Sequence, residues 1–567
     1  MSADRYRAAG WWRPERVDDL VLRHAGALAG RCAVVGEQRR MTYRQLAAAV
    51  DGTAARLHRL GLRAPEPVLL QLPNTIELLV LALALMRAGC PPVLAMPTLR
   101  EHELRPVIAT LRPAALAVPP PSRAFDHMEM ARRLIKEHDC VRTLLAWDDL
   151  RALCSPADGE PVHGDPVHGD PVDADPGRVH ASQPHDIALH LLSSGTTGPP
   201  KGIPRTHEAF TSVIRAASDV SVLDRDTVYL AAIPVTHSFA FGHPGVLGTL
   251  AHGGRVVLAR SADPAHCLDL VERERVTHCA LVPGLAAQWL TDLRDHPRDV
   301  SSLRVLQVGG ARLDPALARR LATGLDCAVQ QVYGMSEGLL CFTRLDDPDD
   351  MAATTQGRPA APGDELRVVD DAGRTVPPGT VGELWTRGPS TITAYAAGAR
   401  PPEAFAPGGF YRTGDLVRLD DAGNAVVVGR VKDVINRSGE KIPAGDLETL
   451  LMRHPAVCAA AVVAMPHPLH GEAVCAVVVP PGDDAPTLRE LRDFLRAQGV
   501  APFKLPDRLE VVAALPTTGV GKVDKARLRR TVAELVAAGR QNPAGTTAVG
   551  QESPSSSRSA AAGVSSR

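Results

Sequence analysis

Short apolar runs and longer amphipathic runs alternate along the first 430 residues of the chain. PVLLQL at 67–72 is followed by IELLVLALALMRAG at 76–89 and PPVLAM at 91–96, and then by a helical pattern through the Arg100 region. Short runs rich in β-branched residues predict buried strands, and the longer Ala/Leu/Arg-rich runs predict helices. This alternation predicts an α/β fold in which parallel β-sheets are covered by helices.

The pattern changes near residue 430, where GNAVVVGR at 423–430 ends the first block. The runs that follow are LETLLMRHPAV at 447–457, AAAVVAMP at 459–466, AVCAVVVPP at 473–481, LRELRDFLRAQ at 488–498 and RLEVVAAL at 508–515. They predict a compact α+β set of about 100 residues, which is a common domain size. We therefore expect a large N-terminal domain over 1–430 and a small mobile C-terminal domain over 431–540.

Two stretches lack the residues that build a core. Residues 155–178 contain PVHGDPVHGDPVDADP, a five-residue repeat of Pro, Gly and Asp, and residues 541–567 are rich in Ser, Gly and Ala. Such compositions bury too little apolar surface to fold. We expect a disordered insertion at 155–178 and a disordered tail at 541–567.

Charge and composition favour a cytoplasmic protein that binds small molecules or proteins. The 567 residues include 63 basic and 64 acidic side chains, so the chain lacks the basic surplus of proteins that bind nucleic acid or anionic membranes. ELLVLALALM at 77–86 is far shorter than the ~20 residues of a membrane span. The ten cysteines form no CxxC pair, which disfavours a structural metal site.

The stretch LLSSGTTGPPKG at 191–202 has the chemistry of a phosphate-binding loop. Exposed backbone N–H groups, several hydroxyls and the ammonium of Lys201 suit a polyphosphate. It is not a Walker P-loop, because Gly202 stands where that motif needs Ser or Thr. An ordinary surface turn is the alternative for this stretch taken alone.

Four later stretches combine glycine with charged residues. YGMSEG at 333–338 carries Glu337, YRTGD at 411–415 ends in Asp415, GRVKDVINRSGEKI at 429–442 groups several charges, and TTGVGK at 517–522 ends in Lys522. Each by itself is compatible with a solvated loop.

Taken together and in this order, the five motifs resemble the adenylate-forming superfamily of acyl- and aryl-CoA ligases, peptide-synthetase adenylation domains and luciferases. The resemblance covers residues from about 20 to 540. IPRTH at 203–207, IPVTHSFAFGHPGVLG at 233–248, TRLDDP at 343–348 and QGRPAAPGDELRVVDDAGR at 356–374 are similar to the stand-alone aryl-acid AMP ligases, such as 2,3-dihydroxybenzoate-AMP ligases.

This resemblance implies ATP and Mg²⁺ as cofactors, with Glu337 binding the metal. It implies catalytic roles for Lys522 and His237, and ribose contacts from Asp415 and Arg430. The ATP-binding positions it implies are Ser193, Ser194, Gly195, Thr196, Thr197, Gly198, Lys201, Gly309, Gly310, Ala311, Tyr333, Gly334, Asp415 and Arg430.

The resemblance also implies a substrate, a small aromatic acid, and a set of residues that contact it. These are His237, Ser238, Phe239, His243, Gly310, Val332 and Leu340. Members that use dihydroxybenzoate carry Asn and Ser where this chain has Ser238 and His243. We therefore expect an aromatic or heteroaromatic acid other than plain 2,3-dihydroxybenzoate, unless His243 merely packs beneath the pocket.

The implied reaction has two steps. The acid attacks ATP to give an acyl adenylate, and a thiol of phosphopantetheine on an aryl carrier protein then takes the acyl group, as in non-ribosomal peptide, antibiotic or siderophore biosynthesis. Free coenzyme A is the alternative acceptor. The family's hinge position corresponds to Lys432, and the loop around Gly439 would serve the thiol step.

Two other functions are considered. Gly334–Gly338 fits G-x-S-x-G, the nucleophile elbow of α/β-hydrolases, but that motif requires a helix after its serine, and LLCFTRLDDPDD at 339–350 predicts extended chain ending in turns. A non-catalytic adenylate binder would be expected to have lost Lys522, Asp415 or Glu337. All three are present.

Overall fold

The computed structural model describes residues 3–122, 125–155, 182–193, 200–437, 440–467, 471–482, 484–498, 500–518 and 521–538. The predictions of disorder at 155–178 and 541–567 fall on segments outside these residues, apart from Ser155.

The chain forms two compact units. The first comprises Met1–Lys432 together with the turn Thr517–Lys522, and the second begins at Asp433 and continues from Val523 after that turn. The boundary therefore falls two residues beyond the position 430 expected from the sequence.

One sheet of the first unit, called here the β3 sheet, has the strand order β6-β5-β3-β4-β7-β8 among the described residues. Its strands are β3 (Val68–Leu70), β4 (Pro92–Leu94), β5 (Ala115–Ala117), β6 (Thr143–Leu145), β7 (Ile187–Leu192) and β8 (Gly202–Thr206). The strands are parallel except for the antiparallel pair β7 and β8. Every residue of β3, β4 and β5 is buried, as expected for short strands covered on both faces.

A larger sheet, the β12 sheet, has the order β15-β14-β13-β12-β11-β9-β10-β1-β2 among the described residues. Its strands are β1 (Cys32–Val35), β2 (Arg40–Thr42), β9 (Val228–Ala231), β10 (Arg255–Leu258), β11 (His278–Leu281), β12 (Val305–Gly309), β13 (Ala328–Gly334), β14 (Leu340–Phe342) and β15 (Arg358–Pro359). Its centre is parallel, and β2, β14 and β15 run antiparallel to their neighbours.

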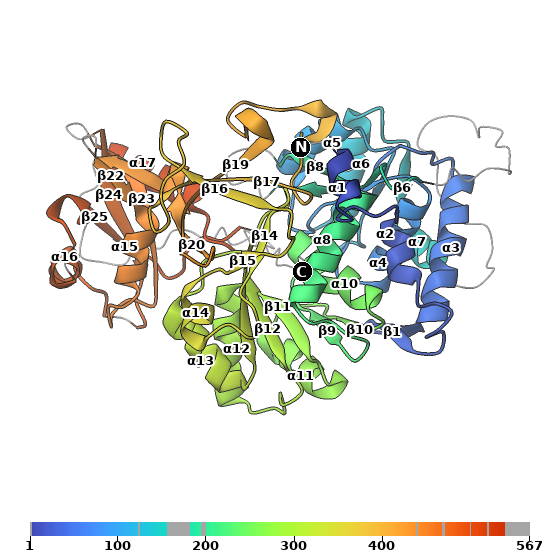
Figure 1. Ribbon diagram of the computed structural model, residues 1–567, viewed down its shortest axis with the longest axis horizontal. Coiled ribbons are helices and arrows are strands. Elements are labelled where there is room, and N and C mark those ends of the chain that lie inside the picture. The colour runs from blue at the N-terminus through green and yellow to red at the C-terminus, as the bar shows by residue number, and fades with distance from the viewer. Residues whose placement is uncertain are drawn as a thin grey trace, which may run out of the picture. The chain divides into compact units, whose positions relative to one another are not determined.

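Helices cover both faces of these two sheets. A shared layer lies between them and forms one apolar core with strands of both: α2 (Val17–Leu22), α3 (Tyr43–Arg59), α4 (Ile76–Arg87), α8 (His207–Val220) and α10 (Gly245–Ala251). The outer face of the β3 sheet packs on α5 (Glu101–Leu111) and α6 (His127–Glu137). The outer face of the β12 sheet packs on α11 (Pro264–Glu274), α12 (Pro283–Asp295) and α13 (Pro315–Leu325) (Figure 1). This layering is the α/β fold that the alternating pattern predicts.

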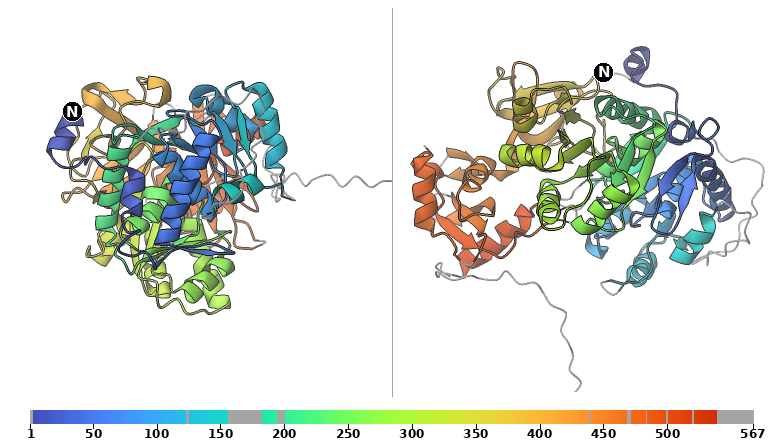
Figure 2. Two further views of the ribbon diagram at one scale, coloured as in Figure 1. Left: turned by 90° about the vertical axis from the view of Figure 1, so that its right-hand side faces the viewer. Right: turned by 90° about the horizontal axis from the view of Figure 1, so that it is seen from below.

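The remaining helices are short and mark connections. They are α1 (Ala3–Ala8), α7 (Trp147–Leu153), α9 (Ser238–Gly242) and α14 (Asp349–Thr354). The segment that follows α1 contacts the loops around residues 363 and 389. The indole of Trp12 donates to the Pro389 carbonyl at 3.0 Å, and the Trp11 ring faces Gly363, where a Cβ atom would lie 2.5 Å from it. Figure 2 shows the same ribbon from two further directions.

The third sheet of the first unit, the β19 sheet, is antiparallel throughout. Its strands are β16 (Glu365–Val369), β17 (Gly382–Arg387), β18 (Phe405–Ala406), β19 (Phe410–Leu419) and β20 (Ala425–Arg430), and the single-turn 3₁₀ helices η1 (Ala396–Gly398), η2 (Pro407–Gly409) and η3 (Val431–Asp433) lie near their ends.

The second unit is the α+β domain that the sequence predicts. Its strands are β21 (Val434–Arg437), β22 (Glu440–Pro443), β23 (Ala459–His467), β24 (Gly471–Val479) and β25 (Arg508–Val511), in the order β22-β21-β24-β23 with β25 beside β24. Alternate residues of β23 and β24 point to opposite faces of this sheet. One face packs on α15 (Ala444–Leu451) and α16 (Leu488–Ala497), and the other packs on α17 (Lys525–Ala537). The 3₁₀ helix η4 (Pro502–Lys504) precedes β25.

Within the part of the chain that the structure describes, no helix has the length and apolar character needed to cross a membrane.

The side chain of Asn74 joins the β3 sheet to the β12 sheet. Its amide donates to the carbonyl oxygens of Ala231, Ile233 and Ala259 at 3.0–3.1 Å, and its oxygen accepts from the Val235 N–H at 2.7 Å. These groups end β9 and β10 and lead toward His237. One amide therefore contacts backbone groups at the ends of two neighbouring strands, among them the Ala231 carbonyl, which also accepts from the Ala259 N–H at 3.2 Å.

Replacing Asn74 by Ala is expected to destabilise the first unit by roughly 2–4 kcal/mol, because several partly buried backbone groups lose their partner. The measurement is the urea midpoint of the unfolding transition, with the exposed Asn436→Ala as the matched control. An unchanged midpoint for Asn74→Ala would contradict this role.

Candidate active site

The two ends of the predicted phosphate loop meet at Ser193 and Lys201. The Ser193 N–H donates to the Lys201 carbonyl at 3.0 Å, and the Lys201 N–H donates to Ser193 Oγ at 2.9 Å. The adjacent strands β7 and β8 pair up to Leu192 and Gly202. The loop is thus the connection of an antiparallel hairpin, closed at its base. Ser194, Gly195, Thr196, Thr197 and Gly198 lie outside the described residues.

Glu337 lies in the tight turn between β13 and β14. Its carboxylate Oε1 accepts a hydrogen bond from the Tyr395 hydroxyl at 3.2 Å, and its carbonyl accepts from the Ile392 N–H at 2.8 Å. Burial raises the pKa of this carboxyl group. The residues after Ser336 continue as β14 rather than as a helix, so the hydrolase elbow lacks the geometry it requires.

A single carboxylate such as Glu337 fits Mg²⁺ bound chiefly through substrate phosphates. Mg²⁺ usually keeps several waters and takes one or two carboxylates together with phosphate oxygens, rather than an all-protein cage. Among the described residues, no three His, Cys, Asp or Glu side chains group as a metal site. Glu337 retains acceptor capacity beyond the one bond from Tyr395, because an ionised carboxylate has about four acceptor positions.

Asp415 is held from two sides. Its Oδ2 accepts from the Tyr333 hydroxyl at 2.7 Å, and its Oδ1 pairs with Arg430 Nε at 2.9 Å. The pairing of β19 with β20 places Asp415 directly opposite Arg430. Asp415 is buried, and burial together with this carboxylate raises the pKa of Tyr333 well above its usual value. The carboxylate is therefore fixed in orientation, as recognition of a ribose diol requires.

The two glycines at the end of β12, Gly309 and Gly310, form a strip of backbone without side chains. Gly309 is buried, and a Cβ atom there would lie 2.8 Å from the Val332 carbonyl and 3.2 Å from the Phe239 ring. Gly310 has φ +83°, and it and Ala311 are exposed. The lack of a side chain at Gly309 therefore lets Val332 and Phe239 pack against the strand, and the positive φ of Gly310 disfavours a side chain there.

Around α9 lie the predicted substrate residues. His237 caps the helix, its Nδ1 accepting from the Phe239 N–H at 3.2 Å, and Ser238 Oγ lies 3.1 Å from Ser336 Oγ. Burial, assisted by Lys522, lowers the pKa of His237 to about 4. His237 is therefore neutral at physiological pH.

His243, at the end of α9, is 4% exposed, and its ring lies edge-on to Phe210 at 6.1 Å between centroids. Burial, and next the charge of Arg205, lower the pKa of His243 to about 3. Val332 and Leu340 are buried on the adjoining strands β13 and β14, and Gly334 packs against Leu340.

Lys522 ends a glycine turn that belongs to the first unit. The Thr518 N–H donates to the Lys522 carbonyl at 2.7 Å, and the Lys522 side chain reaches Gly310, where a Cβ atom would lie 3.3 Å from Lys522 Cε. Burial, then repulsion from Arg430, lowers the pKa of this ammonium to about 8, against the opposing pull of Asp415 and Glu337. The structure therefore gathers Lys522, Asp415, Glu337 and the glycine strip in one region.

Several polar residues of this region were not predicted from the sequence. Tyr395 contacts Glu337, and Ser336 pairs with Ser238. Arg205 is 2% exposed and donates through Nη1 to the Ser336 carbonyl at 3.4 Å, while its Nε and Nη2 are buried without a partner among the described residues. Arg205 stands within IPRTH, so its motif was noted, but nothing local signals these contacts.

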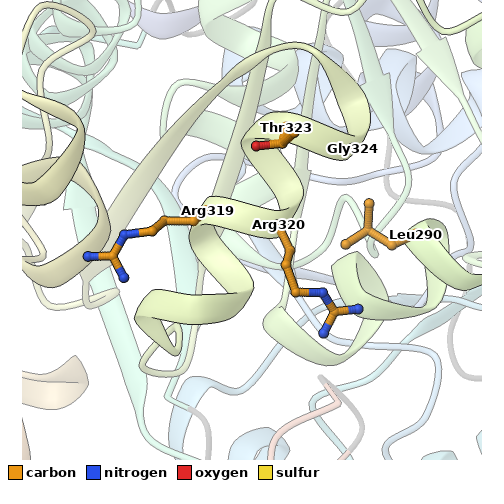
Figure 3. Close-up of a pocket in the computed structure, with 5 residues that line it drawn as sticks. All are labelled: Leu290, Arg319, Arg320, Thr323 and Gly324. Atoms are coloured by element: carbon orange, nitrogen blue, oxygen red, sulfur yellow. The ribbon is translucent and has the colours of Figure 1, made fainter.

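Two surface hollows lie apart from the predicted site residues. One, of about 430 Å³, lies over α12 and α13 and is lined by Leu290, Arg319, Arg320, Thr323 and Gly324. Figure 3 shows Arg319 pointing away from Leu290, and its guanidinium pairs with Asp350 at 2.6 Å. None of the predicted site residues lines this hollow.

Comparison with known proteins agrees with this geometry. Residues 21–396 match the family model "AMP-binding enzyme", and residues 446–522 match "AMP-binding enzyme C-terminal domain". The chain belongs to the AMP-binding enzyme family, and it is an adenylate-forming ligase.

Its relatives place it within one branch of that family, the aryl-acid AMP ligases. It is 46% identical to a salicylyl-CoA synthase / salicylate adenylyltransferase from Streptomyces sp. (94% of this chain, 96% of the relative). It is 41% identical to the 2,3-dihydroxybenzoate-AMP ligase of Bacillus subtilis (95% and 97%). The apo structure of Mycobacterium smegmatis MbtA matches with a TM-score of 0.69 at 40% identity, covering 93% of this chain and 97% of that one.

The pKa of Lys522 predicts an alkaline limit on the free enzyme. If its ammonium stabilises the anionic transition state, kcat/KM for ATP–pyrophosphate exchange is full below pH ~8 and falls as the pH rises through the pKa of about 8. In Lys522→Arg, any residual activity should lose this limb, because a guanidinium stays protonated up to pH ~12. The exposed Lys136→Arg is the control, and a wild-type profile that stays flat to pH ~9.5 would contradict the assignment.

Proposed function

We propose that this protein activates an aromatic or heteroaromatic carboxylic acid with ATP and transfers the acyl group to the phosphopantetheine thiol of an aryl carrier protein. The observation that carries the proposal is the grouping of Asp415, Glu337 and Lys522 around the Gly309–Gly310 strip. It is supported by relatives that include a salicyl-AMP ligase / salicyl-S-ArCP synthetase from Mycobacterium tuberculosis, 42% identical over 93% of each chain.

In the first step a carboxylate oxygen of the acid bonds to the α-phosphorus, and pyrophosphate leaves. Two anions must approach each other, so the protein's task is to position them and compensate their charge. Asp415 would accept hydrogen bonds from the ribose hydroxyls, and Lys201 would contact the outer phosphates. Lys522 would lie between the acid's carboxylate and the α-phosphate.

Bound Mg²⁺ would neutralise phosphate charge at Glu337. In the second step the thiolate sulfur attacks the acyl carbonyl, and AMP leaves with the bonding electrons. Neutral His237, capping α9 beside Ser238, would contact the acid in both steps without adding charge.

The acceptor has a second candidate, free coenzyme A. The relative at 46% identity is named both as a salicylyl-CoA synthase and as a salicylate adenylyltransferase. A carrier protein and coenzyme A present the same pantetheine thiol. Supplying each in turn to enzyme preloaded with acyl adenylate separates the two acceptors.

The residues near His243 bear on the choice of acid. Ser238 with Ser336 offers hydroxyl groups, and His243 offers a neutral imidazole. A site that hydrogen-bonds a substrate group rejects analogues that leave its polar groups unpaired. We infer an acid whose polar substituents differ from those of 2,3-dihydroxybenzoate.

The test is ATP–pyrophosphate exchange over a panel of aryl, heteroaryl and fatty acids. Ser238→Asn with His243→Ser should raise kcat/KM for 2,3-dihydroxybenzoate relative to the preferred acid by roughly 10- to 1000-fold. Two contacts change at about 1–3 kcal/mol each, and their effects are expected to add only in part. The two single variants are controls for additivity. An active double variant with an unmoved preference would exclude these residues as selectivity determinants, and a panel in which only fatty acids react would overturn the proposed substrate class.

Two single substitutions should each impair one half-reaction and leave the other intact. Lys522→Ala should abolish adenylate formation yet spare thioester formation from supplied aryl adenylate, because the ammonium acts on the first step. Lys432→Pro should do the reverse, since Lys432 adjoins the unit boundary and proline fixes φ near −65°. Each half-reaction is measured separately, and equal loss of both in either variant would argue against this division of labour.

A further inference from the structure

Tyr395 contacts two of the groups that the proposed function assigns to ATP and its metal. Its hydroxyl donates to Glu337 Oε1 at 3.2 Å, and its ring lies under the Lys201 ammonium, with Nζ 4.9 Å from the ring centroid. No other residue among those described is shown in contact with both side chains. One aromatic side chain thus joins the metal carboxylate to the end of the phosphate loop.

The direction of the hydrogen bonds at Tyr395 follows from its neighbours. The hydroxyl groups of Tyr395 and Tyr411 are 2.9 Å apart. An ionised Glu337 can only accept, so the Tyr395 proton must be the one shared with the carboxylate. Tyr411 also interacts with Glu337, so the two phenol hydroxyls and the carboxylate form one hydrogen-bonded group.

The position of Tyr395 is fixed by packing. Its ring meets Phe405 and Tyr411 edge-on at 5.8 and 6.5 Å, and it is 7% exposed. A Cβ atom on Gly202, the neighbour of Lys201, would lie 3.1 Å from the Cβ of Ala396, the neighbour of Tyr395. The absence of a side chain at Gly202 therefore lets the two segments approach.

We propose that Tyr395 is a positioning residue, which sets the Glu337 carboxylate and the Lys201 ammonium at a fixed separation for Mg²⁺ and the outer phosphates of the nucleotide. This inference rests on the proposed function. The hydroxyl orients the carboxylate oxygen and leaves the rest of its acceptor capacity for the metal. The ring holds the ammonium through its negative face.

Two variants separate the two contacts. Tyr395→Phe removes the hydroxyl and keeps the ring, whereas Tyr395→Leu removes both. Tyr229→Phe is the matched control, because Tyr229 is buried and its hydroxyl has no hydrogen-bond partner among the described residues. Tm and circular dichroism establish that each variant is folded.

The readout is binding of α,β-methylene-ATP, which cannot be adenylylated, measured by calorimetry with Mg²⁺ titrated and also in EDTA. Tyr395→Phe should raise the Mg²⁺ concentration for half-maximal binding about 10-fold, the loss of one hydrogen bond to a charged group, and leave the Kd in EDTA unchanged. Tyr395→Leu should in addition weaken binding in EDTA about 3-fold, through the lost contact with Lys201. Tyr229→Phe should change neither value.

A folded Tyr395→Phe with unchanged Mg²⁺ dependence would overturn the proposal, and so would equal weakening with and without Mg²⁺. Failure of the wild-type protein to bind the analogue at all would instead overturn the proposed function.

Discussion

The site depends on one close backbone contact, between the turn Met335–Gly338 and the segment that follows β17. Gly338 has φ +150°, and a Cβ atom there would lie 2.2 Å from the Ser390 carbonyl oxygen. The neighbouring Ile392 N–H donates to the Glu337 carbonyl. Only glycine fits both the conformation and the space. This contact joins the β12 sheet to the β19 sheet, and it delivers the segment carrying Tyr395 to the hairpin of the β3 sheet. Groups from three sheets meet because one residue has no side chain.

The same arrangement concentrates charge where little water enters. Asp415 has partners on both oxygens, and Glu337 accepts a hydrogen bond from the Tyr395 hydroxyl. The Nε and Nη2 atoms of Arg205 have no hydrogen-bond partner among the described residues. Burial removes the hydration of each of these groups, and the hydrogen bonds and ion pairs that they form compensate only part of that free energy. Under the proposed function, an anionic ligand with its bound cation would supply interactions that these charged groups lack in the free protein. Polar groups that are fixed in place before the ligand binds are said to be electrostatically preorganised.

The sequence predicted the fold where the signal was local. The run at 76–89 is the helix Ile76–Arg87, the run at 459–466 lies in β23, and the unit boundary falls at Lys432 and Asp433. These features follow from the spacing of apolar residues and from a change in that spacing. Strand lengths were less predictable, since β3 covers only Val68–Leu70 of the apolar run at 67–72.

Only those residues of the site that lie in sequence motifs could be predicted. Ser193 and Lys201 close one loop, but Tyr333 reaches Asp415 from the β12 sheet, and Tyr395 reaches Glu337 from the connection after β17. Tyr395 stands 58 residues from Glu337 along the chain, and no periodicity predicts that they meet. Ser336 lies inside the motif YGMSEG, but a role in this site was predicted for the neighbouring Glu337 and not for Ser336. Contacts between distant segments depend on tertiary packing, which the local pattern does not encode.

The charge of Arg205 constrains what His243 can contribute to recognition. Burial lowers the pKa of Arg205 only to about 10, so its guanidinium stays protonated at physiological pH. Burial lowers the pKa of His243, and the charge of Arg205 lowers it further, to about 3. An imidazole in that position remains neutral across the range in which the protein works. It can therefore offer one donor and one acceptor, the choice of nitrogen being set by its tautomer. Under the proposed function, selectivity at this end of the site would depend on matching hydrogen bonds, because the histidine has no charge with which to attract a substituent.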